Sequence, residues 1–242
     1  MSDNQANNTN ITQYETKMAE IMQFMNNAQF IEAERELLKI KQEADADTDA
    51  PNELRSDICY KLYHIAWINH DKTNAFKYAE NAIAFLSNND AKVQVYGNLA
   101  MNSLQSNQLE DADKFIENGL NLITEMTPTS WYLYLIRGKI HLRKGNLDAA
   151  LDDFTHSASE ANRLHMPHGE IAATICVADV LFRKGLANSA LMEIIRMENY
   201  ARKTMQMQQY LRVMIKKAQL LYQMGRDEDV KQVILTIPDF ND

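Results

Sequence analysis

The stretch LRKGNLDAAL at residues 142–151 has a near copy, LFRKGLANSAL, at residues 181–191. Each contains Arg-Lys-Gly followed, five positions after the glycine, by alanine, and the two glycines lie 40 residues apart. Gly can adopt the left-handed backbone that ends a helix and reverses the chain. The cations before it favour the negative end of the helix dipole, and the alanine lets two helix axes approach closely. The stretch therefore predicts a helix, a tight turn and a second helix packed on the first.

The alanine that follows the turn recurs along most of the chain. It is found as Ala33, Ala75, Ala112, Ala150 and Ala190, with Val230 in its place in the last unit, at intervals of 42, 37, 38, 40 and 40 residues. Four and seven residues after each alanine comes an apolar or small residue, as in Leu37 and Ile40 or Phe154 and Ser157. This spacing is typical of a helix that packs on one side.

A second amphipathic segment precedes each of these markers, separated from it by Gly or a polar turn. The segments are Met18–Met25, Ile58–Ile68, Val93–Leu104, Leu133–Leu142, Ile171–Phe182 and Leu211–Tyr222. Gly and Pro are rare, at 7 and 4 of 242 residues, which favours long helices over a turn-rich β fold. We therefore expect an all-α protein of about six helix pairs.

These residues resemble the tetratricopeptide repeat family, in a long variant with units of 37–42 residues. The family has a small residue at position 8, a small residue or Gly at the turn, Ala at position 20 and an apolar residue at position 24. The residues that match are Gly138, Gly145, Ala150 and Phe154; Ala178, Gly185, Ala190 and Ile194; Ala218, Gly225 and Ile234; and Ala100, Ala112 and Ile116. Val230 departs from the pattern, and Ile21 and Tyr63 stand where a small residue is expected.

The resemblance covers residues 14–237 and implies a right-handed α-solenoid in which each pair buries its apolar face against its neighbours. From it we expect a disordered N-terminal tail at 1–12, a single superhelical domain at 13–238 and a C-terminal tail at 239–242. Pro238 is expected to stop the last helix.

Composition limits the classes of function. The apolar runs are too short to cross a bilayer, and the polar start lacks a signal-peptide core, so we expect a cytoplasmic protein without membrane insertion. The net charge of −8 disfavours nucleic-acid binding. Residues 1–60 carry a net −7 and residues 137–217 a net +5. Solvated helix faces are the simplest explanation of this asymmetry; the alternatives are an acidic partner near the basic segment or end-to-end self-association.

The side chains that could carry chemistry do not form a known site. Asp45, Asp47 and Asp49 alternate like the start of a calcium loop, but Ala50 and Ser56 stand where such a loop needs Gly and Glu. Residues 43–56 are therefore expected to form an acidic, solvated linker between the first two units. His165 and His168 are a close pair without further ligands at metal-binding spacing, and Cys59 and Cys176 are expected to be reduced. No phosphate-binding loop or nucleophile motif occurs. We predict no enzymatic activity, no metal and no cofactor.

The resemblance also implies that the first helix of every pair lines a concave groove that binds a peptide or a partner protein. The residues mapped to this groove are Met18, Met22, Met25, Tyr60, His64, Trp67, Asn98, Met101, Tyr132, Leu135, Lys139, Arg143, Asp179, Arg183 and Tyr222. Methionines suit an adaptable apolar surface and aromatic residues anchor bound peptides. The alternative is that the methionines are core residues and that the charged residues form a solvated face.

We therefore expect a protein- or peptide-binding scaffold or adaptor whose partner is acidic and apolar. One alternative is a sensor of a signalling peptide or small molecule that regulates a partner by a change of superhelix pitch. A second alternative is a structural protein that forms homo-oligomers.

Overall fold

The structure, a computed structural model, describes residues 2–124 and 129–237, and side chains from residue 13 onward. These residues form twelve helices and no strand, as expected of an all-α fold. The predicted C-terminal tail at 239–242 and the stop at Pro238 lie outside the described residues. The chain divides into two compact units, Met1–Val95 and Tyr96–Asp242.

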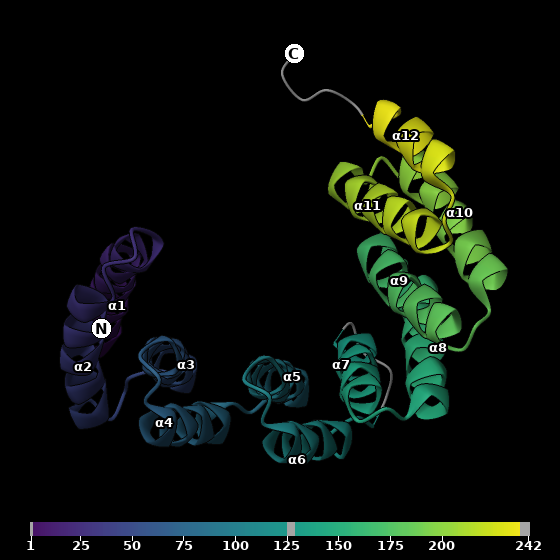
Figure 1. Ribbon diagram of the computed structural model, residues 1–242. Helices are drawn as coiled ribbons and strands as arrows, with labels where there is room; N and C mark the ends of the chain where they lie inside the picture. The colour runs from purple at the N-terminus through teal and green to yellow at the C-terminus, as the bar shows by residue number, and fades with distance from the viewer. Residues whose placement is uncertain (1, 125–128, 238–242) are drawn as a thin grey trace. The chain divides into compact units, whose positions relative to one another are not determined.

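The first unit contains two complete helix pairs and the start of a fifth helix (Figure 1). Its elements are α1 (Ser2–Asn26), α2 (Phe30–Ala46), α3 (Asn52–Ile68), α4 (Lys72–Phe85) and the first part of α5 (Asn89–Gln105). One core cluster joins α1, α2 and α3 through buried residues such as Met18, Ile21, Leu37 and Leu62.

The second unit contains the remaining helices in two layers. They are the rest of α5, α6 (Leu109–Leu120), α7 (Ser130–Arg143), α8 (Leu147–Arg163), α9 (Pro167–Arg183), α10 (Ala187–Lys203), α11 (Met207–Gln223) and α12 (Asp227–Leu235). In Figure 1, α7, α9 and α11 form one layer, and α8, α10 and α12 form the other. All six amphipathic segments predicted to precede the markers are helical.

The turn inside each pair has the same backbone geometry. Its left-handed residue is Gly145, Gly185 or Gly225 in the last three pairs, with φ between 71° and 81°. In the first three pairs Ala28, His70 and Asn107 adopt the same conformation, with φ near 60°. A backbone bond spanning six residues closes each turn, as in Asn146 N–H to His141 O at 2.9 Å. These bonds satisfy carbonyl groups at the end of the first helix.

The marker residue lies five positions after this left-handed residue in every pair. The five marker alanines are 0% exposed, and Leu37, Ile116, Phe154 and Ile194 after them are at most 1% exposed. Ser157, the polar residue in this pattern, donates a hydrogen bond to the carbonyl of Trp131 at 2.8 Å, which allows its burial. Ile21 and Tyr63 lie at the repeat position that is occupied by a small residue, such as Gly138, in the later pairs. Both are buried there although they are large.

Two boundaries bear on the predicted organisation. Helix α1 begins at Ser2 in a segment without Pro or Gly, and the disordered tail expected over residues 1–12 stays a prediction. Residues 43–56 were predicted as a linker, but α2 continues to Ala46 and α3 begins at Asn52. The extent of the domain as a whole stays a prediction.

Candidate interaction surface

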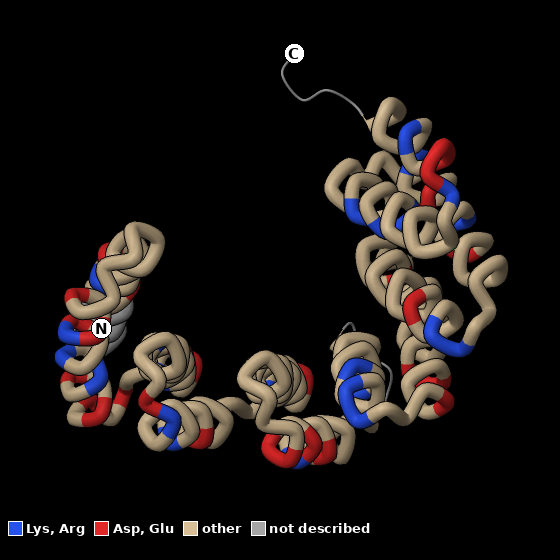
Figure 2. The backbone as a smooth tube through the Cα atoms, viewed as in Figure 1, with Lys and Arg blue, Asp and Glu red and all other residues tan. Residues whose placement is uncertain are grey.

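The layer formed by α7, α9 and α11 collects the cations of the second unit. These three helices carry seven Lys and Arg residues and two acids, Glu170 and Asp179. Helices α8, α10 and α12 carry nine acids and five Lys and Arg residues. The basic segment found in the sequence is therefore divided between the two layers, with the positive excess on one of them (blue in Figure 2).

We use the name α7–α9–α11 face for the residues at equivalent repeat positions on these helices: Tyr132, Lys139, Arg143, Ile175, Asp179, Arg183, Arg212 and Ile215. Arg143, Arg183 and Arg212 are exposed, and Ile215 is 53% exposed. Tyr132 is half-buried, and its burial raises the pKa of its hydroxyl. The face therefore offers both cationic and apolar contacts.

The charges of this face lie close to one another. Lys216 on α11 donates to Asp179 on α9 at 2.7 Å. Burial raises the pKa of the Cys176 thiol on α9, and the charges of Lys139, Lys216 and Arg212 act on it in the opposite direction. Charged side chains from α7, α9 and α11 therefore act together on the half-buried Cys176.

Lys139, Arg143 and Arg183 of this face have no acid partner among the described residues, and Arg212 donates to the neutral side chain of Gln209. Among the residues that the structure describes, Asp179 is the acid of this face, and it already binds Lys216. No ion pair within 4.0 Å involves Lys139, Arg143 or Arg183 in the described part of the chain. An incoming carboxylate would therefore not have to displace an existing partner from them.

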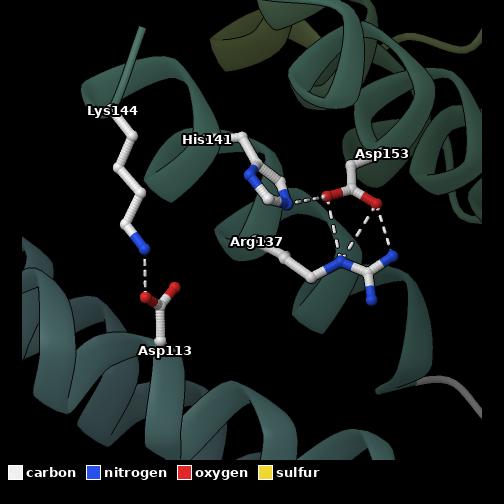
Figure 3. A network of polar contacts seen from close by, with 5 residues as sticks. All are labelled: Asp113, Arg137, His141, Lys144 and Asp153. Atoms are coloured by element: carbon white, nitrogen blue, oxygen red, sulfur yellow. Dashed lines mark hydrogen bonds and ion pairs between the residues drawn. The ribbon is translucent and has the colours of Figure 1, made fainter. Parts of the chain in front are cut away.

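Other cations of the same helices stabilise the fold instead. Arg137 on α7 makes two-pronged hydrogen bonds to Asp153 on α8, with Nη2 at 2.6 Å from Oδ1 and Nε at 3.0 Å from Oδ2, and His141 Nε2 lies 3.6 Å from the same carboxylate (Figure 3). Hydrogen bonding to Asp153 raises the pKa of Arg137. Since Asp153 is 5% exposed, this pair compensates the burial of its carboxylate.

The lysine of the Arg-Lys-Gly turn connects neighbouring pairs. Lys144 pairs with Asp113 on α6 (Figure 3), and Lys184 pairs with Asp148 on α8. The sequence predicted only a favourable interaction of these lysines with the helix dipole. Their acid partners are 31 and 36 residues away, so local sequence patterns could not identify them.

In the first unit, the predicted groove residues Tyr60, His64 and Trp67 form part of an aromatic row. The ring centroids of Tyr60 and His64 are 4.6 Å apart, with an angle of 82° between the ring planes. The ring centroids of Trp67 and Phe76 on α4 are 6.1 Å apart. All three predicted residues are half-buried. Burial, followed by the charge of Lys61, lowers the pKa of His64. Their packing is consistent with a structural role.

The remaining predicted groove residues differ in exposure. Met18 and Leu135 are 8% and 5% exposed and belong to the core clusters, which favours the alternative that they are core residues. Met25, Asn98 and Met101 are half-buried. Met22 is 40% and Tyr222 is 71% exposed.

The acidic linker and the histidine pair also have structural contacts. The carboxylate of Asp47 accepts from the backbone N–H of Asp49 at 3.0 Å, and His168 packs edge-on against Trp131 with ring centres 5.6 Å apart. In the described residues no group of three His, Cys, Asp or Glu side chains is arranged to hold a metal ion. No helix in that part of the chain is long and apolar enough to cross a membrane.

Comparison with known proteins supports the fold. No family model matches the chain, and no curated protein matches it. Among solved structures, it is similar to BtubC from P. vanneervenii, with a TM-score of 0.67 and 18% identity over 79% of this chain and 80% of that one. It is also similar to nearly identical TPR-like repeats from Podosopora anserina, with a TM-score of 0.60 and 12% identity over 79% and 96% of the two chains. Aspartyl phosphate phosphatase F from Bacillus subtilis gives a TM-score of 0.64 and 11% identity over 91% and 72%.

Proposed function

We propose that this chain, which has the fold of the tetratricopeptide-repeat-like proteins, is a non-enzymatic scaffold or adaptor that binds an acidic, partly apolar segment of another protein. The observation that carries the proposal is the positive excess on the layer of α7, α9 and α11, where Lys139, Arg143 and Arg183 lack acid partners among the described residues. A cytoplasmic location is part of the proposal.

The chemistry of the α7–α9–α11 face defines the ligand. Carboxylates would contact Lys139, Arg143 and Arg183, while aliphatic or aromatic side chains would pack on Tyr132 and Ile215. An exposed ion pair contributes only about 0–1 kcal/mol, so the cations are expected to increase the association rate and the specificity more than the affinity. Binding should therefore weaken as salt increases, since the Debye length falls from ~10 Å at 0.1 M to ~3 Å at 1 M.

Binding can be tested with an array of labelled peptides that alternate acidic and aliphatic residues, together with basic versions of the same length. We expect the chain to bind the acidic series. The triple variant Lys139→Glu, Arg143→Glu and Arg183→Glu should lose this binding at least tenfold.

A matched control has the same change in net charge on helices outside the layer of α7, α9 and α11. Lys114, Lys203 and Lys231 are exposed on α6, α10 and α12, and their joint replacement by Glu should leave peptide binding unchanged. Equal losses in both triple variants would show that only net charge matters and would refute the proposed face. The sensor alternative predicts that a small molecule or one defined signalling peptide binds this face while the acidic series does not.

A further inference from the structure

The last helix pair exposes a position that the preceding pairs bury. Ile234 on α12 is 57% exposed, whereas Ile194, 40 residues earlier, is 0% exposed. Phe154 and Ile116, at the same position in the two pairs before, are 0% and 1% exposed. The neighbours differ within the described residues: Ile194 shares a core cluster with Val213 and Met214 of α11, and Phe154 shares one with Ala173 and Val180 of α9.

Further apolar residues around Ile234 share this exposure. We call them the C-terminal end surface: Leu211, Ile215, Tyr222, Val230, Ile234 and Ile237. Leu211, Ile215 and Tyr222 are spaced by four and seven residues on α11. Val230, Ile234 and Ile237 are spaced by four and three residues. Ile215 and Tyr222 are 53% and 71% exposed. Leu211, Val230 and Ile237 are half-buried, while the residues 40 positions earlier, Ile171, Ala190 and Met197, are 0% exposed.

In the preceding pair a helix covers the equivalent surface. Val213 and Met214 of α11 lie in one core cluster with Ile171, Ala190 and Ile194 of α9 and α10. Helix α11 is amphipathic, and its two lysines pair with acids of the preceding helices. Lys216 pairs with Asp179 on α9, and Lys217 pairs with Glu198 on α10. The C-terminal end surface repeats this apolar pattern and is therefore suited to one more amphipathic helix.

Charge indicates how that helix would be oriented. In two earlier pairs, the lysine at the end of the incoming helix pairs with an acid near the start of the preceding second helix, Lys144 with Asp113 and Lys184 with Asp148. Helix α12 begins with Asp227, Glu228 and Asp229. We infer that the C-terminal end surface binds an amphipathic helix of a partner protein, with apolar residues on one side and a Lys or Arg in its last turn placed beside the acidic start of α12.

A second copy of the chain fits this surface poorly through its first helix. In the repeat register, Val213, Met214 and Leu220 of α11 correspond to Thr16, Lys17 and Gln23 of α1. These three residues would place polar groups on an apolar surface. Helix α1 also has no basic residue in its last turn. Head-to-tail stacking would therefore lack both the apolar contacts and the terminal ion pair.

The test uses a fluorescein-labelled peptide with the sequence of residues 167–185, carrying Cys176→Ser, because this helix ends in Arg183 and Lys184 and occupies an equivalent surface in the chain. We expect saturable binding to the full chain, followed by fluorescence anisotropy. Ile234→Glu should weaken binding at least tenfold and Asp227→Lys about threefold. Met192→Glu is the matched control, since Met192 is 70% exposed on α10, and should have no effect.

The same measurements separate this inference from the proposed function. The triple variant of Lys139, Arg143 and Arg183 should bind the helical peptide as the parent chain does. Absence of saturable binding, or an equal loss with Met192→Glu, would overturn the inference. Sedimentation of the chain alone provides a second test: a dimer that Ile234→Glu abolishes would identify a second copy as the occupant and refute a partner helix. Circular dichroism checks that each variant is folded; if Ile234→Glu unfolds, Ile234→Ser replaces it.

Discussion

Replacement of Gly138 by Ala should destabilise the second unit, although Ala is the better helix former. A methyl group at residue 138 on α7 would lie 2.6 Å from Cε1 and 2.7 Å from Cδ1 of Phe154 on α8. Because Phe154 is fully buried, its ring has little space to move, and we place the cost near the upper end for overpacking, about 3 kcal/mol. The gain in helix propensity is about 1 kcal/mol. We therefore expect a net loss of about 2 kcal/mol in the free energy of unfolding.

The neighbouring pairs indicate which second change should restore stability. Ala178 is paired in the repeat with Ile194, and Ala100 with Ile116, so a small side chain at the first position accompanies Ile at the second. The double variant Gly138→Ala/Phe154→Ile reproduces this combination. It should be more stable than Gly138→Ala alone, with a coupling energy of about 2 kcal/mol between the two sites.

The assay is urea unfolding followed by circular dichroism, together with hydrogen exchange of the α7 and α8 amides, because stability in helical repeats is largely local. Phe154→Ile alone provides the fourth corner of the double-mutant cycle and should cost about 1 kcal/mol. The reasoning would be wrong if Gly138→Ala were as stable as the parent chain. Additive effects of the two changes would also contradict it, because the proposed cause is one steric contact between these side chains.

Three further predictions concern the turns and the buried charges. Gly185→Ala should cost about 1 kcal/mol, since Gly185 has φ of +81°, and Gly185→Asn should cost less because Asn tolerates this conformation; thermal unfolding of both compares them. Asp153→Ala should cost about 3 kcal/mol in urea unfolding because it leaves Arg137 without its partner, and a loss below 1 kcal/mol would show that solvent replaces the carboxylate. Because the folded-state pKa of His64 is below that of the unfolded chain, the unfolded state binds the proton first, so stability is lost as the pH falls below about 6.5. His64→Gln should reduce the stability difference between pH 7.5 and pH 5.5, and an unchanged difference would assign the pH dependence to other groups.

The sequence predicted much of the fold because its signals are local. The turn that follows Leu142 is closed by backbone bonds within six residues, and its glycine and alanine are five positions apart, so both can be identified by inspection. Polar turns were predicted before Ala33, Ala75 and Ala112, and the left-handed residues of these turns are Ala28, His70 and Asn107, none of which is glycine. The sequence indicates less about residues 1–12, because a polar segment without Pro or Gly neither favours nor interrupts a helix strongly.

By itself, the sequence determined the helix pairs, their register and the positive charge of residues 137–217, since these follow from composition and from contacts within one turn of helix. Only the tertiary structure decided which of those charges are available. Stacking brings Asp153 to Arg137 and Asp113 to Lys144, buries Met18 and Leu135, and leaves Lys139, Arg143 and Arg183 without acid partners among the described residues. Exposure and ion pairing depend on residues that are distant in the chain and adjacent in space, and no periodicity within a single helix encodes them.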